Sequence, residues 1–151
     1  DAIGGFICNA TDWMTSCEAT AGCDWAYSPR GAQCNSPANG GKFCNLGAFD
    51  FDASTTGNQD GLLPTASPKL QNCGADWSNL FANASPKIFD MTGNLREITK
   101  SGSNIYPLLG GAYSTTSDDA AKCDFDFYVV DQSFQLIDTG FRCCFSSDPR
   151  L

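Results

Sequence analysis

The stretch IFDMTGNLREITKSG, residues 88–102, decides how this chain is interpreted. Inside this stretch, a span of eight residues contains Asp90, Gly93, Asn94 and Glu97. Carboxylate oxygens combined with turn carbonyls, without a soft ligand, suit a calcium ion. The composition alone favours an ordinary Asn-containing turn between two strands. Three interpretations therefore stay open: a turn, a cation site, or a working catalytic segment.

Around this stretch the chain reads as a mixed α+β domain. Asn9 or Thr11 is suited to cap a helix of two to three turns, with Trp13, Cys17 and Met14 on one side. Gly22 to Thr65 is rich in Gly, Pro, Asn and Ser, which predicts a long loop region. ADWSNLF predicts a single helical turn. Strand-like segments follow: KIFDM, NLREITK, NIYPLLGGAY, CDFDFYVV, in which Phe and Asp alternate, and TGFRCCF.

No linker or repeat divides the 151 residues, so we expect one domain over residues 1–151. A chain of this length buries roughly 70% of its unfolded surface, which is enough for a core. The formal charge is -8, and the nine Lys and Arg residues are scattered. This pattern disfavours nucleic acid and anionic membranes as partners. No apolar stretch is long enough to span a bilayer.

The nine cysteines are irregularly spaced, and none forms a C-x-x-C pair. They predict disulfides in an oxidising compartment, and hence a secreted or cell-surface protein. The odd number leaves one thiol that is free, bound to another chain, or paired outside this sequence. Cys143 and Cys144 could form a vicinal disulfide, but neighbours on a strand point to opposite faces, which favours different partners. Cys123 is expected to pair with Cys143 or Cys144.

The absence of histidine excludes Ser-His-Asp and Cys-His catalysis and His-ligated metals. Asp50/Asp52, Asp118/Asp119 and Asp124/Asp126 are pairs of the kind that glycoside chemistry uses. Turns, caps and solvent-facing strand positions explain these aspartates more simply. We therefore predict no catalytic residue.

Six segments, in order, resemble the formylglycine-generating (sulfatase-modifying factor) family, whose domain is C-type-lectin-like. They are GGFICNATDWMTSC, CDWAYSPRGAQCN, CN…GNQDGLLPT, IFDMTGNLRE, LLGGAY and TGFRCC, and they cover residues 4 to 145. Each segment is weak alone, whereas the ordered set is specific. The resemblance implies a loop-rich, disulfide-stabilised, formylglycine-generating-enzyme-like fold.

The resemblance also implies up to two structural calcium ions. The first set of ligands is Asn45, Asp60 and the carbonyls of Leu46 and Leu62. The second set is Asp90, Glu97 and the carbonyls of Gly93 and Leu95. Every side-chain ligand at these positions is an oxygen donor.

Catalysis does not carry over from the family. Its oxidases hold copper(I) with two thiolates shortly after a tryptophan in an RGGSW segment. Here Leu109 replaces that arginine, Tyr113 the tryptophan, and Thr115 stands at the first thiolate position. Arg96 and Ile98 replace aromatic residues of the second calcium loop. A copper-dependent oxidase is accordingly the least favoured function.

The match begins inside the family domain, so the resemblance implies that an N-terminal part of that domain is missing. Its absence would expose a sheet edge and apolar surface. We expect a non-catalytic extracellular module, stabilised by calcium and disulfides, for adhesion or ligand binding, with a glycan or protein as ligand. The alternative is a subunit of an extracellular assembly or pilus-like filament, completed by a neighbouring chain through strand addition.

Overall fold

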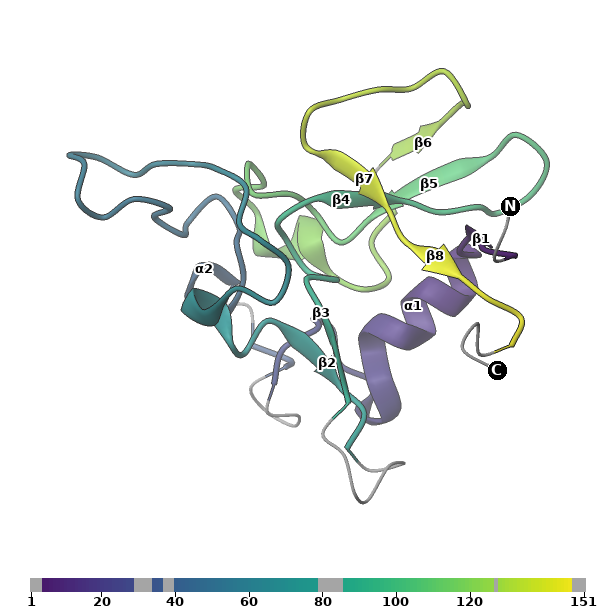
Figure 1. The fold of residues 1–151 in the computed structure, drawn as a ribbon, viewed down its shortest axis with the longest axis horizontal. Coiled ribbons are helices and arrows are strands. Elements are labelled where there is room, and N and C mark those ends of the chain that lie inside the picture. Colours follow the sequence, from purple (N-terminus) through teal and green to yellow (C-terminus); the bar gives the residue numbers. More distant parts are fainter. Residues whose placement is uncertain (1–3, 29–33, 37–39, 79–85, 127, 148–151) are drawn as a thin grey trace.

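The structure is a computed structural model that describes residues 4–28, 34–36, 40–78, 86–126 and 128–147. It is a mixed α+β fold of short strands joined by turns (Figure 1). The helices are α1 (Ala10–Glu18) and α2 (Gly40–Phe43), with 3-10 turns at Ala19–Ala21, Pro68–Leu70 and Asp118–Ala121. The strands are β1 (Phe6–Ile7), β2 (Gly74–Asp76), β3 (Lys87–Phe89), β4 (Arg96–Ile98), β5 (Tyr106–Leu109), β6 (Tyr128–Val130), β7 (Thr139–Phe141) and β8 (Cys143–Cys144).

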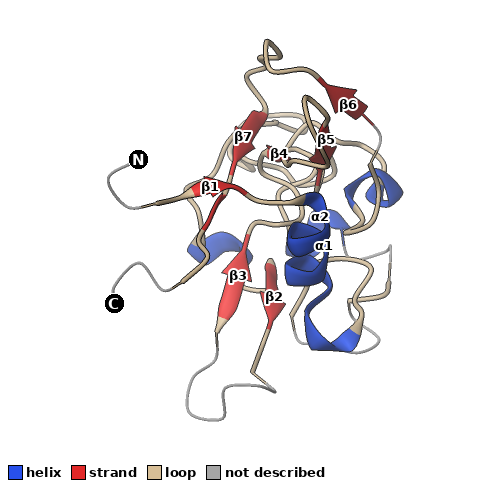
Figure 2. Ribbon diagram, turned by 90° about the vertical axis from the view of Figure 1, so that its right-hand side faces the viewer, coloured by secondary structure: helices blue, strands red, loops and turns tan. Residues whose placement is uncertain are grey.

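The strands form three small sheets. The largest has four strands in the order β6-β5-β4-β7, in which β7 runs parallel to β4 and the other pairs are antiparallel. β1 pairs with β8, and β2 pairs with β3, both antiparallel. Figures 1 and 2 show the β2–β3 hairpin and α1 side by side, below the four-stranded sheet.

The predicted N-terminal helix is confirmed as α1. Asn9 is its N-cap, Asp12 lies in its first turn, and Trp13 and Cys17 are buried. The helix packs its apolar side against Leu109 of β5 and Met91 in the second of two core clusters. The first cluster lies around Trp25, Tyr27 and Phe43, and Trp25 and Tyr27 stack with ring centroids 5.8 Å apart.

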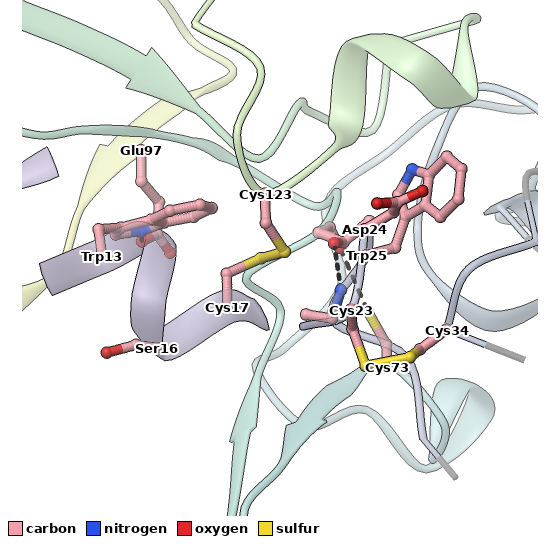
Figure 3. Close-up of a disulfide and its surroundings, with 12 residues drawn as sticks. Trp13, Ser16, Cys17, Cys23, Asp24, Trp25, Cys34, Cys73, Glu97 and Cys123 are labelled. Atoms are coloured by element: carbon pink, nitrogen blue, oxygen red, sulfur yellow. Dashed lines mark hydrogen bonds between the residues drawn. A yellow bond between two sulfur atoms is a disulfide. The ribbon is translucent and has the colours of Figure 1, made fainter. Parts of the chain in front are cut away.

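Four disulfides hold the loops: Cys8–Cys144, Cys17–Cys123, Cys23–Cys34 and Cys44–Cys73. The prediction that Cys123 pairs with Cys143 or Cys144 is wrong. Cys123 reaches α1 instead, because its backbone N–H donates to Asp24 O at 2.7 Å and holds this segment beside Cys17 (Figure 3). The disulfides indicate an oxidising, non-cytoplasmic environment.

Two predicted elements are corrected. The strand in CDFDFYVV does not begin at Cys123, because residues 123–126 are turn and irregular chain, and β6 starts at Tyr128. The disulfide that ties Cys123 to α1 keeps this segment out of the sheet. Ala75 and Asp76 of ADWSNLF lie in β2 rather than in a helical turn, and the end of that segment lies outside the described residues.

The two faces of the four-stranded sheet differ. Glu97 of β4 and its β5 partner Leu109 are buried on the inner face, next to Trp13. Because side chains alternate along a strand, the residues beside Glu97 point the other way. The row Phe141, Ile98, Leu108 and Tyr128 consists of register partners that cross β7, β4, β5 and β6. We call this side the outer face.

Candidate cation site and the outer face of the sheet

The loop from Asp90 to Leu95 has an unusual backbone. Asp90, Gly93 and Asn94 adopt φ of 57°, 75° and 63°, in the left-handed region. A Cβ at Gly93 would lie 2.5 Å from the carbonyl oxygen of Asn45. Glycine is therefore required where this loop passes against the Asn45 segment.

The two predicted calcium loops are joined by a pair of buried asparagines. Asn45 Nδ2 donates to Asn94 Oδ1 at 3.0 Å and to the carbonyl of Gly61 at 2.8 Å. Asn94 also accepts from Leu63 N and donates to Leu63 O, each at 3.0 Å. These bonds bring Asn45 to the Asp60–Leu62 segment and tie both to the second loop.

The first set of predicted ligands therefore lies on two segments that the bond from Asn45 to Gly61 holds together. Asn45 and Leu46 are buried, whereas Asp60 and Leu62 are exposed. The amide nitrogen of Asn45 makes both hydrogen bonds, which leaves Oδ1 as the atom that could meet a cation. The Leu46 carbonyl already accepts from Phe49 N at 2.7 Å. Amide, carbonyl and carboxylate oxygens together fit a hard cation in donor chemistry.

Three members of the second set, Asp90, Leu95 and Glu97, line one pocket of about 190 Å³, and Gly93 does not. The other lining residues are Thr65, Asn94, Gly140, Phe141 and Arg142. Asp90 is half-buried, and its Oδ2 accepts from Ala66 N at 2.8 Å. Burial raises the pKa of Asp90, and the Glu97 carboxylate raises it further, against the opposing effects of the Ala66 N–H and Arg142. The carboxylate of Asp90 is thus held where its charge is poorly solvated.

Glu97 is already neutralised by a protein group. Arg142 Nη2 lies 2.6 Å from Glu97 Oε1, and Arg142 Nε donates to Oε2 at 3.0 Å. The indole N–H of Trp13 also donates to Oε2, and Figure 3 shows the Trp13 ring lying against Glu97. As paired in this structure, the second set does not fit a calcium ion, because a guanidinium occupies the carboxylate that the ion would need.

Sequence reasoning missed Arg142 and Trp13 as members of this site. Both lie in segments that carry the resemblance, but no local pattern in the sequence marks either as a partner of Glu97. The available signal was a buried acidic position, Glu97, within a strand, which requires a cationic or hydrogen-bonding partner. Among the described residues, no group of three or more His, Cys, Asp or Glu side chains could hold a metal ion.

The residues that correspond in sequence to the family's copper segment make contacts within the fold. Leu109 packs in the second core cluster, and Thr115 Oγ1 accepts from Ala112 N at 2.8 Å. Cys143, the free cysteine, is exposed in β8. The other eight cysteines are paired.

The outer face is apolar and only partly covered. Phe141 is 65% exposed and Tyr128 49%. Phe134 and Leu136, from the β6–β7 connection, line a cavity of about 150 Å³ with Arg96, Leu108 and Tyr128. A second cavity, of about 140 Å³, lies among Ile7, Ile98, Tyr106, Asp131, Gln132 and Phe134. Arg96 is neutralised by Asp138 at 2.7 Å.

Comparison with protein families, with characterised proteins and with solved structures finds no match. Within the described residues, no helix is both long and apolar enough to cross a membrane. The functional argument therefore rests on the geometry of this chain.

Proposed function

We propose that this protein is a non-catalytic, disulfide-stabilised extracellular module that works by binding another polypeptide across the outer face of its sheet. The observation that carries the proposal is the apolar row through Phe141, Ile98, Leu108 and Tyr128, whose two ends, Phe141 and Tyr128, are exposed, while Leu108 is buried. Exposed, contiguous apolar surface on a folded protein marks an interaction site. Adhesion or ligand binding is the first form of this function.

A formylglycine-generating-enzyme-like, C-type-lectin-like fold is part of the proposal. The Asn45–Asn94 pair supports it, because it joins the two loops in which the resemblance implies cation sites. In such a scaffold, the rigid core presents loops and faces for recognition. One structural calcium ion at Asn45, Leu46, Asp60 and Leu62 belongs to the same proposal.

The pairing of the cysteines supports a non-catalytic role. A copper(I) site of the family's kind needs two thiolates, the soft ligands that this ion prefers. With four disulfides formed, the chain has one thiol, Cys143. Thr115, at the first thiolate position, offers only a hydroxyl.

The second form of the function is a subunit of an extracellular assembly, and Cys143 favours it. Its β1 register partner is Ile7, which lines the outer-face cavity with Ile98. Phe141, the exposed last residue of β7, lies two residues before Cys143. The thiol thus lies at the margin of the apolar surface, where a bound polypeptide with its own cysteine would meet it.

The test is the mass of the protein in solution, measured by sedimentation equilibrium from low to high micromolar concentration. If a second copy binds the outer face, the measured mass will exceed that of the monomer. The double variant Phe141→Ser/Tyr128→Ser should return the mass to that of the monomer. Val129→Ser is the matched control, because Val129 is 59% exposed on the same strand but alternates to the other side. A monomer at every concentration would contradict the assembly form. Equal behaviour of the double variant and the control would contradict the outer face as the site.

A further inference from the structure

The pocket beside β4 holds two carboxylates in a half-buried setting. Glu97 is buried, Asp90 is half-buried, and they are close enough for Glu97 to raise the pKa of Asp90. Two desolvated negative charges need a counter-charge to be stable in a folded protein. In this chain the counter-charge comes from Arg142.

Arg142 contacts oxygens in the way that a bound cation would. Its guanidinium meets both oxygens of Glu97, at 2.6 and 3.0 Å, and the carbonyl of Phe89 at 3.0 Å. This fork-to-carboxylate geometry is strong and directional. Glu97 is held in place from the other side by the Trp13 indole.

We propose that Arg142 is the resident cation of this pocket and that it keeps a divalent ion out. Glu97 and Arg142 cancel in charge, so Asp90 alone remains to attract a metal ion. A divalent ion coordinated by Glu97 would lie within a few ångströms of the guanidinium and be repelled by it. The inference is independent of the proposed function of the outer face.

Removal of the guanidinium should convert the pocket into a site for a hard cation. Glu97 Oε1 would then be free and Oε2 would keep only the Trp13 indole N–H, beside Asp90 in a pocket of about 190 Å³ also lined by Asn94 and Leu95. Carboxylate oxygens with backbone carbonyls are the ligands that calcium and lanthanide ions take. Arg142→Gln removes the charge while it keeps much of the side chain.

Trp13 supplies a local reporter, because its indole donates to the same carboxylate. Terbium(III) would be titrated into wild type and Arg142→Gln while terbium luminescence is excited through tryptophan. We expect at least a ten-fold larger signal from Arg142→Gln, abolished by added Trp13→Phe and by competing calcium. A signal that depends on Trp13 comes from an ion in this pocket rather than from an ion bound by the first set of predicted ligands, which includes Asn45. Arg96→Gln, which removes the Arg96–Asp138 pair on the opposite side of β4, is the control and should behave as wild type.

A Trp13-dependent terbium signal in the wild type would overturn the inference. A folded Arg142→Gln without such a signal would also overturn it. If Arg142→Gln does not fold unaided, calcium but not magnesium should restore folding, and failure of that rescue counts against the inference. Arg142→Lys keeps the positive charge and should stay without signal.

Discussion

The position of Asp90 in the fold disfavours the charged form of its carboxylate. Its φ of 57° is left-handed, and burial is the main cause of its raised pKa. A carboxyl whose folded pKa exceeds its unfolded pKa binds its proton more tightly in the native state. The charged carboxylate therefore lowers the stability of the fold at pH values above the folded pKa. This penalty is relieved as the pH falls through the folded pKa toward the unfolded pKa.

Asp90→Asn should consequently stabilise the protein at pH 7 by about 0.5–1 kcal/mol. Asparagine tolerates the left-handed backbone, and its amide oxygen can still accept from Ala66 N. The gain should shrink as the pH falls through the raised pKa of Asp90. Urea unfolding at pH 7 and pH 4 measures both effects, with Glu97 and Arg142 as the charged neighbours in the pocket.

Asp131→Asn is the opposite control. Hydrogen bonds from the Ser133 side chain and backbone lower the pKa of Asp131, so its contribution is favourable at pH 7 and lost as the pH falls through that lowered pKa. Its substitution should destabilise slightly at pH 7. A loss of stability in Asp90→Asn, together with a similar loss when a chelator is added to the wild type, would show that Asp90 holds a cation instead.

The contact partners of individual residues were the hardest feature to predict from the sequence. The acidic positions Asp90 and Glu97 stand out because carboxylates in a strand-rich, buried segment need partners. Their partner Arg142 is separated by 45 positions from Glu97 and depends on the parallel pairing of β7 with β4, which no local pattern encodes. The exposed loop position of Asp60 gave no local sign of whether it meets Asn45.

The loops around Asn45 and Asn94 act as one element. Asn94 has φ of 63° and exchanges hydrogen bonds with Asn45 and both backbone groups of Leu63. Each such bond contributes about 1 kcal/mol, and a buried group left without its partner costs about 1–3 kcal/mol. The pair therefore determines how two long loops dock on the core.

Asn94→Ala should destabilise the protein by about 2–4 kcal/mol, because it removes three hydrogen bonds and places alanine in a left-handed conformation. Asn104→Ala is the matched control, since Asn104 has φ of 60° but is exposed. It should cost about 1 kcal/mol. Thermal unfolding of both variants measures the difference, and equal losses would contradict the role of the Asn45–Asn94 pair.

Elements with a clear period were predicted well. Asn9, Trp13 and Cys17 predicted α1, and the strands predicted within residues 87–91, 94–100 and 104–113 appear as β3, β4 and β5. The segment in which Phe and Asp alternate, including Phe125 and Asp126, does not form a strand. The Cys17–Cys123 disulfide and the Cys123–Asp24 hydrogen bond outweigh the two-residue period of this alternation. Ala75 and Asp76 became strand because they pair with β3.

At the scale of the whole molecule, disulfides replace much of the regular structure. Cys17–Cys123 closes a sequence separation of 106 residues and Cys23–Cys34 one of 11. Cys8, directly after β1, is bonded to Cys144 of β8, and Figure 1 shows β1 and β8 near the two ends of the chain. The presence of disulfides was predictable from composition, but their connectivity was not, because pairing depends on which segments the fold brings together.

Removal of the long-range disulfide should cost more than removal of the short one. The loop-entropy relation gives about 5 kcal/mol for Cys17→Ala/Cys123→Ala and about 3 kcal/mol for Cys23→Ala/Cys34→Ala. All four cysteines are buried, so the cavity cost is similar in both variants. Guanidinium unfolding of the two variants measures the gap, and a larger loss from the short loop would contradict this ordering.

In the assembly form of the proposed function, the outer face binds a neighbouring polypeptide, and Cys143 at its margin forms a disulfide with that polypeptide. The most direct test is disulfide mapping of protein purified from its natural source, with free thiols alkylated at lysis and peptides analysed without reduction. We expect Cys143 to be recovered in a disulfide with a cysteine from beyond the nine of this sequence, or with Cys143 of a second copy. Recovery of Cys143 as an alkylated free thiol, with the other eight cysteines paired, would contradict it.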